Sequence, residues 1–222
     1  MIAPSSVKEF LTHIIKEKLA VIKSQYTNFN IAFVNWLTEE LSKEMLSVCV
    51  AGDYEVLDFA QRMCKNELLN NRCGDDNYYS MAIVLSRGFA KAHKVKAERV
   101  VHIVMGKESS CRWSKDGLEA YTVRKANNNV YTIRNCKKLA EYYIVQVNAC
   151  TLLDYQLPHE VADVYAILCE VVEVSGSSIK ASDFLRYLVK VKGFNRESAL
   201  KAIELAIKLN LIKYSGGYLA PL

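Results

Sequence analysis

The last quarter of the chain constrains the fold most, because residues that end helices alternate there with apolar runs of helical spacing. Gly176, Gly193 and Asn210 each follow such a run, and glycine or asparagine in a left-handed conformation commonly follows the last turn of a helix. Gly216 and Gly217 separate two short runs typical of strands, which predicts a hairpin. The expected elements are a helix over 159–174, a short strand over 178–180, a helix capped by Ser182 and ended by Gly193, a helix over 195–209 and a hairpin over 211–220.

With this order of elements, the segment from Leu157 to Leu222 resembles the winged-helix superfamily of helix-turn-helix proteins. The residues that carry the resemblance are the Gly193–Phe194 turn, the packing positions Ala202, Ile203 and Ala206, the Asn210, Leu211 and Ile212 exit, and the glycine-tipped hairpin. The resemblance covers about 65 residues and marks a fold shared by many functions. In DNA-binding members the third helix reads the major groove and the wing touches the backbone or the minor groove. The resemblance implies groove contacts from Asn195, Arg196, Ser198 and Lys201, and wing contacts from Lys213, Tyr214 and Tyr218.

The third predicted helix departs from a DNA-reading helix in two ways. Its exposed stripe alternates Glu197, Lys201, Glu204 and Lys208, and such pairs stabilise a solvated helix, whereas carboxylates repel phosphate. More than half of its surface is apolar, as expected of a helix that packs against a second partner as well as its own core. The sequence therefore also allows a homodimer or a protein partner to contact this helix.

Residues 1–95 are predicted to form a helical bundle. Ser6 and Glu9 fit a capping box, and the apolar residues that follow keep helical spacing to about Ser24. Glycine and polar clusters then end each helical stretch. The further helices are expected over 30–50, 53–70 and 76–95.

After Lys96 the pattern changes to that of strands. Residues 100–105 form a β-branched run, and residues 118–125 and 130–135 flank the turn residues 127–129, which predicts an antiparallel hairpin. A further strand is expected over 142–147, or else a helix that begins near Lys137. The fold class is predicted as α+β and predominantly helical, with an N-terminal helical bundle (1–95), a small central antiparallel sheet (96–150) that can pack with the bundle as one domain, and a C-terminal winged helix (157–222).

The predicted hairpin contains a short internal repeat, because Tyr121–Arg124 is echoed ten residues later by Tyr131–Arg134. Strand side chains alternate between faces, so the tyrosines and aliphatics share one face and the threonines and arginines share the other. This arrangement places Arg124 and Arg134 on an outer face, with Lys125 close by, as candidate phosphate contacts. The other interpretation, an ordinary half-solvated sheet, is the commoner cause of such alternation.

Charge is distributed unevenly along the chain, although the net charge is only +5. Residues 84–140 hold 13 basic and 4 acidic side chains, residues 141–176 hold 6 acidic and no basic ones, and residues 177–222 hold 8 basic and 3 acidic ones. Two basic segments that flank an acidic one indicate a surface that faces a polyanion. Ordinary solvated faces explain any single segment equally well.

No catalytic residue, metal site or cofactor is assigned. Gly106 and Lys107 follow a strand but lack the first glycine and the final hydroxyl residue of a phosphate-binding loop, and the four histidines have no partner at metal spacing. The seven cysteines are odd in number and form no C-x-x-C pair, which favours buried free thiols. No membrane span or secretory signal is recognisable, so a cytoplasmic location without a membrane partner is expected.

The sequence thus predicts a non-enzymatic nucleic-acid-binding protein. DNA is favoured as the ligand, and transcriptional regulation is one use of such binding. The alternative is a protein-interaction subunit, or adaptor, that uses its winged helix as the interface in a larger assembly. An enzyme that processes nucleic acid is the least favoured of the three.

Overall fold

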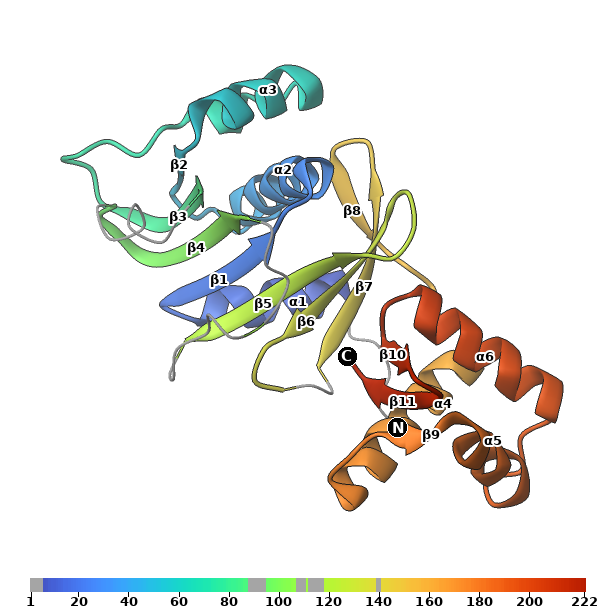
Figure 1. Cartoon of the computed structure of the whole chain (residues 1–222). Helices are drawn as coiled ribbons and strands as arrows, with labels where there is room; N and C mark the ends of the chain where they lie inside the picture. The colour runs from blue at the N-terminus through green and yellow to red at the C-terminus, as the bar shows by residue number, and fades with distance from the viewer. Residues whose placement is uncertain (1–5, 88–94, 107–110, 112–117, 139–140) are drawn as a thin grey trace.

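The computed structural model describes residues 6–87, 95–106, 111, 118–138 and 141–222 (Figure 1). The strands are β1 (Leu19–Ser24), β2 (Val48–Gly52), β3 (Tyr79–Ser86), β4 (Ala97–Met105), β5 (Glu119–Lys125), β6 (Val130–Asn135), β7 (Tyr142–Asn148), β8 (Thr151–Asp154), β9 (Ile179–Lys180), β10 (Ile212–Ser215) and β11 (Tyr218–Pro221). The helices are α1 (Val7–Lys16), α2 (Thr27–Lys43), α3 (Tyr54–Cys64), the 3₁₀ helix η1 (Glu67–Asn70), α4 (His159–Ser175), α5 (Ala181–Lys190) and α6 (Arg196–Lys208). Within these ranges, no helix is long and apolar enough to cross a bilayer.

A large mixed sheet dominates the N-terminal two thirds of the chain. Among the described residues, eight strands form it in the order β2-β3-β4-β1-β5-β6-β7-β8. Neighbouring strands from β2 to β5 run parallel, and those from β5 to β8 run antiparallel. The predicted class, predominantly helical with a small central sheet and an N-terminal helical bundle, is therefore wrong, because the protein is a mixed α/β structure.

Three segments that were predicted as helical are strands. They are residues 19–24, 48–50 and 79–86, which lie in β1, β2 and β3. Parallel strands are buried on both faces, so they show continuous apolar runs in place of alternation. Such a run has no period that separates it from a buried helix. The predicted strand over 100–105 and the predicted hairpin over the 127–129 turn are confirmed as β4 and as β5 with β6.

One face of the large sheet is covered by α1, α2 and α3, whose buried side chains share a single apolar cluster with it. The predicted Ser6–Glu9 capping box is present and starts α1. Phe10 of α1 lies edge-on to Tyr121 of β5, with ring centroids 5.1 Å apart. The hairpin tyrosines therefore lie on one apolar face, as the alternation predicted, and the helices cover that face.

Six of the seven cysteines are paired in disulfides, and Cys169 is free. The bonds are Cys49–Cys73, Cys64–Cys150 and Cys111–Cys136. The prediction of free buried thiols is therefore wrong for these six cysteines. The bonds were missed because the paired cysteines lie 24 to 86 residues apart in the sequence, where no local spacing marks a pair. Disulfides form in oxidising compartments and also inside hyperthermophile cells, so the cytoplasmic location stays a prediction.

The C-terminal module, residues 159–222, contains α4, α5, α6 and a small sheet in the order β10-β11-β9. Its elements lie close to the predicted ranges. Asn195 caps α6 by accepting from the backbone N–H groups of Glu197 and Ser198, and Asn210 has the expected left-handed conformation. One detail differs, since α5 begins at Ala181 after Lys180 without a side-chain cap, so Ser182 is not the capping residue.

The C-terminal module packs on the second face of the large sheet, over β6 and β7 (Figure 1). The Thr132 hydroxyl donates a hydrogen bond of 2.6 Å to the Leu209 carbonyl at the end of α6. The Asn210 side-chain amide donates to the Lys125 carbonyl at 2.8 Å. The exit of α6 is thus attached to the β5–β6 hairpin, and the two units share an apolar interface that includes Val130 and Tyr142.

Candidate nucleic-acid interface

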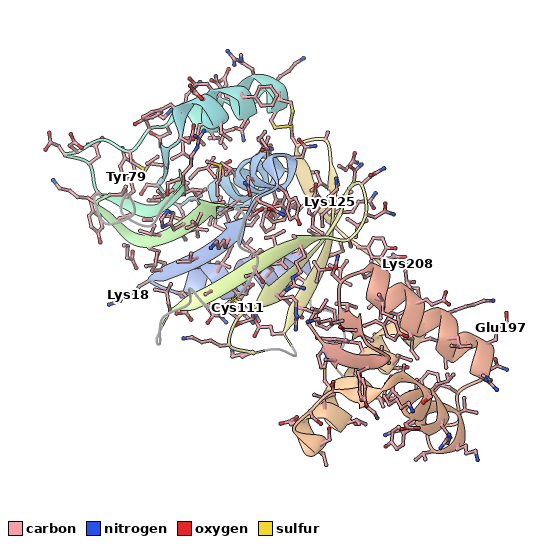
Figure 2. All side chains as sticks on the ribbon, viewed as in Figure 1. Lys18, Tyr79, Cys111, Lys125, Glu197 and Lys208 are labelled. Atoms are coloured by element: carbon pink, nitrogen blue, oxygen red, sulfur yellow. A yellow bond between two sulfur atoms is a disulfide. The ribbon has the colours of Figure 1, made fainter. Side chains whose placement is uncertain are left out.

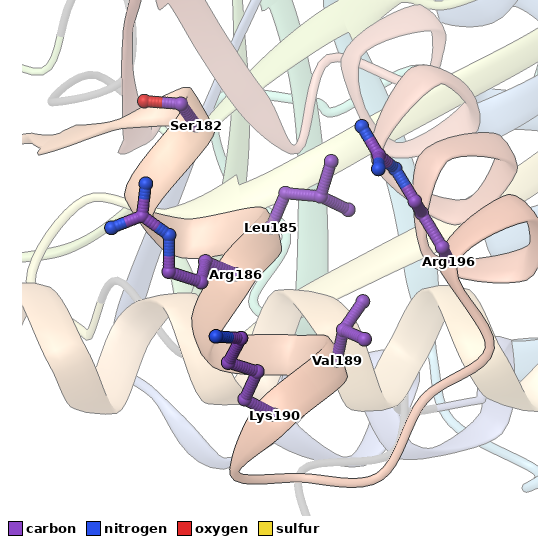
Figure 3. Close-up of a pocket in the computed structure, with 6 residues that line it drawn as sticks. All are labelled: Ser182, Leu185, Arg186, Val189, Lys190 and Arg196. Atoms are coloured by element: carbon purple, nitrogen blue, oxygen red, sulfur yellow. The ribbon is translucent and has the colours of Figure 1, made fainter.

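A cavity of about 370 Å³ lies between α5 and the first turn of α6 (Figure 3). It is lined by Ser182, Leu185, Arg186, Val189, Lys190 and Arg196. In Figure 3, Leu185 and Val189 lie between Arg186 and Lys190 on one side and Arg196 on the other. We call this feature the α5–α6 groove. It has an apolar floor and cationic walls.

Helix periodicity explains how α5 builds its side of the groove. Phe184 and Leu188 are fully buried in the core of the C-terminal module. Residues four apart lie on the same face of a helix. The pairs one and two positions after Phe184 and Leu188 therefore form two stripes next to the buried one. Leu185 with Val189 and Arg186 with Lys190 are two such pairs, and they line the groove side by side.

Few acidic groups offset the positive charge of the α5–α6 groove. Arg186 lies 3.9 Å from the Asp183 carboxylate, in an exposed pair that contributes little stability. Lys190 and Arg196 are exposed and form no ion pair within the described ranges. Their charges are therefore available to an anionic ligand.

The four residues predicted to read a groove from α6 are in unequal positions. Arg196 is exposed and lines the α5–α6 groove. The Asn195 side-chain oxygen is occupied as the helix cap, and Ser198 is half-buried. Lys201 is paired with Glu197 at 2.6 Å, which compensates its charge. The outer face of α6 is therefore less suited to phosphate than the groove beside it.

The predicted wing residues are exposed on the β10–β11 hairpin. Lys213 is exposed, and Tyr214 and Tyr218 are 57% and 49% exposed. The hairpin turns at Gly216 and Gly217, both of which have positive φ, as the predicted glycine-tipped turn requires. Exposed tyrosines beside a lysine can stack on bases and contact phosphate.

The outer face of the β5–β6 hairpin does not have the exposure predicted for it. Arg134 is only 4% exposed, and its Nη2 lies 3.4 Å from the Tyr165 hydroxyl of α4. Burial lowers the pKa of the Arg134 guanidinium. The nearby Tyr165 opposes this shift, and the charge of Arg124 adds to it. The prediction that Arg134 contacts phosphate from a solvated face is therefore wrong, since the C-terminal module covers it.

The other two hairpin cations differ from Arg134 in exposure. Arg124 is half-buried, and its Nε is buried without a hydrogen-bond partner in the described part of the chain. Lys125 is exposed at the hairpin tip, beside the C-terminal end of α6, where Lys208 also lies (Figure 2). Of the three predicted hairpin contacts, only Lys125 lies on an open surface.

The apolar surface of α6 is only partly covered within the chain, because Leu200 is 41% exposed and Leu205 and Ile207 are half-buried. Ala199, Ala202 and Ala206 are buried in the cluster that α6 shares with α4. Leu209 at the end of the helix belongs to the same cluster, which continues onto β6 and β7 through Val130. The dimer or protein contact that the sequence suggests for this helix therefore stays a prediction.

A second polar cluster links α1 to β5, β6 and β7 on the side of the large sheet opposite the C-terminal module. The Tyr143 hydroxyl donates to Glu141 at 2.8 Å, and the Asn135 amide reaches Glu119 at 2.6 Å and Glu141 at 3.2 Å. His13 of α1 lies 3.2 Å from the Glu141 carboxylate. Burial alone would raise the pKa of Glu141, but hydrogen bonds from Tyr143 and Asn135, with the charges of Lys138 and His13, lower it overall. We interpret this cluster as an anchor for α1.

The lowered pKa of Glu141 predicts a pH-dependent stability. Because the carboxylate is favoured in the folded state, it stabilises the fold above the unfolded pKa of 4.5, and this contribution is lost as the pH falls through the lowered folded value. Glu141→Gln should therefore cost about 1 kcal/mol at neutral pH and less in acid, in denaturation curves at both pH values. The exposed Glu170→Gln serves as the matched control. An equal cost at both pH values would contradict this role.

Sequence reasoning found only part of the α5–α6 groove, because it named Arg196 and not Arg186 or Lys190. The available signal was the paired spacing on α5, with two cations four residues apart beside Leu185 and Val189. Comparison with known proteins finds no matching family model, no similar curated protein and no similar solved structure.

Proposed function

We propose that this protein binds nucleic acid, with DNA favoured, through the α5–α6 groove, and that it does so without catalysing a reaction. The observation that carries the proposal is the arrangement of Arg186, Lys190 and Arg196 around an apolar floor. Arginine and lysine side chains supply most phosphate contacts in protein–DNA complexes. The groove also includes the first turn of α6, where backbone dipoles favour a negative charge.

The wing is a second contact in this proposal. Lys213, Tyr214 and Tyr218 are exposed on one hairpin of the C-terminal module, and wings contact the nucleic-acid backbone in DNA-binding winged helices. The adaptor alternative has less support, since most apolar side chains of α6 are buried or half-buried by the chain itself and only Leu200 is exposed. Cationic walls favour a polyanion over an apolar partner.

A charge-matched comparison tests the proposal. The variant with Arg186→Gln, Lys190→Gln and Arg196→Gln should bind labelled duplex DNA about tenfold more weakly or worse at low salt. The slope of log affinity against log salt should also fall by roughly 3, at about 0.9 for each phosphate that is no longer neutralised. Fluorescence anisotropy between about 50 and 200 mM salt measures both quantities.

The control variant carries Lys8→Gln, Lys16→Gln and Lys18→Gln, which remove the same charge from exposed positions in and just after α1. It should keep the affinity and slope of the natural protein. If both variants lost affinity equally, net charge alone would explain the binding, and the α5–α6 groove would have no specific role. No binding to duplex DNA, single-stranded DNA or RNA at low salt would rule the proposal out.

A further inference from the structure

A separate cavity of about 310 Å³ lies outside the carboxyl ends of the parallel strands, far from the α5–α6 groove in the sequence. It is lined by Gln25, Thr27, Asn30, Val56, Arg87, Met105 and Gly106. Gln25, Arg87 and Gly106 directly follow β1, β3 and β4, Met105 ends β4, and the remaining residues belong to α2 and α3, which follow β1 and β2. In parallel α/β sheets, ligands bind in crevices at this end of the strands. The volume is at the lower end of small-molecule pockets.

Hydrogen-bond donors gather at one edge of this carboxyl-end cavity. The 17-residue helix α2 begins at its edge, with Thr27 as first residue, no side-chain cap and no acidic residue in the first turn. An uncapped helix start offers backbone N–H donors to an anion. Arg87 is largely exposed at the edge, where its Nε lies 3.3 Å from the Asp53 carboxylate.

One residue that lines the carboxyl-end cavity, Asn30, carries a buried acceptor that lacks a donor. Asn30, in the first turn of α2, is only 1% exposed, and its Oδ1 has no hydrogen-bond partner in the described part of the chain. A buried acceptor without a partner costs about 1–3 kcal/mol, so such groups are rare unless a ligand or water completes them. This observation is independent of the helix start. It points to a ligand that donates a hydrogen bond.

We infer that the carboxyl-end cavity binds a small phosphate monoester that also carries hydroxyl groups, of the sugar-phosphate class. The phosphate would lie at the start of α2 beside Arg87, where the donors gather. A hydroxyl of the same molecule would donate to Asn30 Oδ1, while Val56 and Met105 supply apolar contact. The inference is independent of nucleic-acid binding, because it uses no residue of the C-terminal module.

Three probes separate the two halves of the inferred ligand in isothermal titration calorimetry on the full chain. Ribose 5-phosphate, which has both features, should bind with a dissociation constant of about 1 mM or tighter. Inorganic phosphate should bind about tenfold more weakly, and ribose should give no saturable binding. If ribose 5-phosphate bound no more tightly than inorganic phosphate, Asn30 would not contact the ligand.

Substitutions of two lining residues test where the ligand binds. Arg87→Gln should weaken ribose 5-phosphate binding about tenfold or more, whereas Arg62→Gln on the exposed side of α3 should leave it unchanged. Asn30→Leu should abolish the preference for ribose 5-phosphate over phosphate while the melting temperature stays equal or rises, because it removes an acceptor without a partner. Replacing a structural residue would instead lower the melting temperature, so the two measurements together distinguish a ligand contact from a structural role.

Two outcomes would overturn the inference. One is the absence of ribose 5-phosphate binding at millimolar concentration in the folded natural protein. The other is binding that survives Arg87→Gln and Asn30→Leu but disappears in the Arg186, Lys190 and Arg196 triple variant, which would move the anion to the α5–α6 groove.

Discussion

Replacing Cys64 and Cys150 by serine is expected to lower the free energy of unfolding by about 4.5 kcal/mol. This disulfide joins residues 86 apart, so it removes more freedom from the unfolded chain than the two bonds that span 24 and 25 residues. In the folded protein it ties the end of α3 to the turn between β7 and β8. Guanidinium denaturation followed by the fluorescence of the buried Trp36 measures the loss.

Two comparisons show whether loop length sets the effect. Removing the Cys49–Cys73 bond should cost about 3.5 kcal/mol, in line with its shorter span. Cys169→Ser, which removes the thiol outside any disulfide, should change stability by less than about 1 kcal/mol. Unchanged stability of the Cys64 and Cys150 variant under non-reducing conditions would show that this bond does not form.

Tyr165→Ala should destabilise the protein by about 3–5 kcal/mol, the usual cost of deleting a buried aromatic side chain. Tyr165 is fully buried between α4 and the large sheet, edge-on to Tyr142 with ring centroids 4.9 Å apart. Its hydroxyl lies close to the buried Arg134 guanidinium, so the substitution also removes a partner of a buried charge. Urea denaturation curves measure the shift.

Milder changes at the same interface separate its parts. Tyr165→Phe keeps the ring and should cost about 1 kcal/mol, the contribution of one hydrogen bond. Arg134→Met replaces a buried charge by an apolar side chain of similar length and should change stability by no more than about 1 kcal/mol. It should also leave nucleic-acid affinity unchanged. A folded Arg134→Met protein with weakened DNA binding would contradict the assignment of Arg134 to the interior.

The C-terminal module could be predicted from the sequence because local residues define its boundaries. Gly176, Gly193 and Asn210 adopt the left-handed conformations expected after helices, and Asn195 caps α6 as predicted. Each of these signals acts within one turn of chain, so no knowledge of the rest of the fold was needed. The α5 start was missed by two residues because its N-cap, Lys180, makes no side-chain cap bond.

The parallel part of the sheet could not be predicted for the opposite reason. Leu19 and Ile22 of β1 continue the helical spacing of α1, and the strand is separated from that helix by only Glu17 and Lys18. In β3, residues 81–86 are buried on both faces, so no alternation marks a strand. Parallel pairing brings together residues from distant segments, and only the assembled sheet specifies it.

The same limit explains the misplaced site residues. Alternation correctly divided the β5–β6 hairpin into two faces, but it could not say that the C-terminal module covers the face with Arg134. The residues that line the carboxyl-end cavity lie at or after the ends of four strands, and only the assembled sheet brings these ends together. Spacing along the chain therefore had no means to reveal the carboxyl-end cavity.

The Cys64–Cys150 bond divides the chain into one closed covalent ring and two open tails. The ring contains β3 to β7, whereas β1 belongs to the N-terminal tail and yet lies between β4 and β5. The two groups of strands inside the ring therefore meet only through a strand from outside it. A truncation that removes β1 would part the sheet in its middle, although every bond of the ring would remain intact.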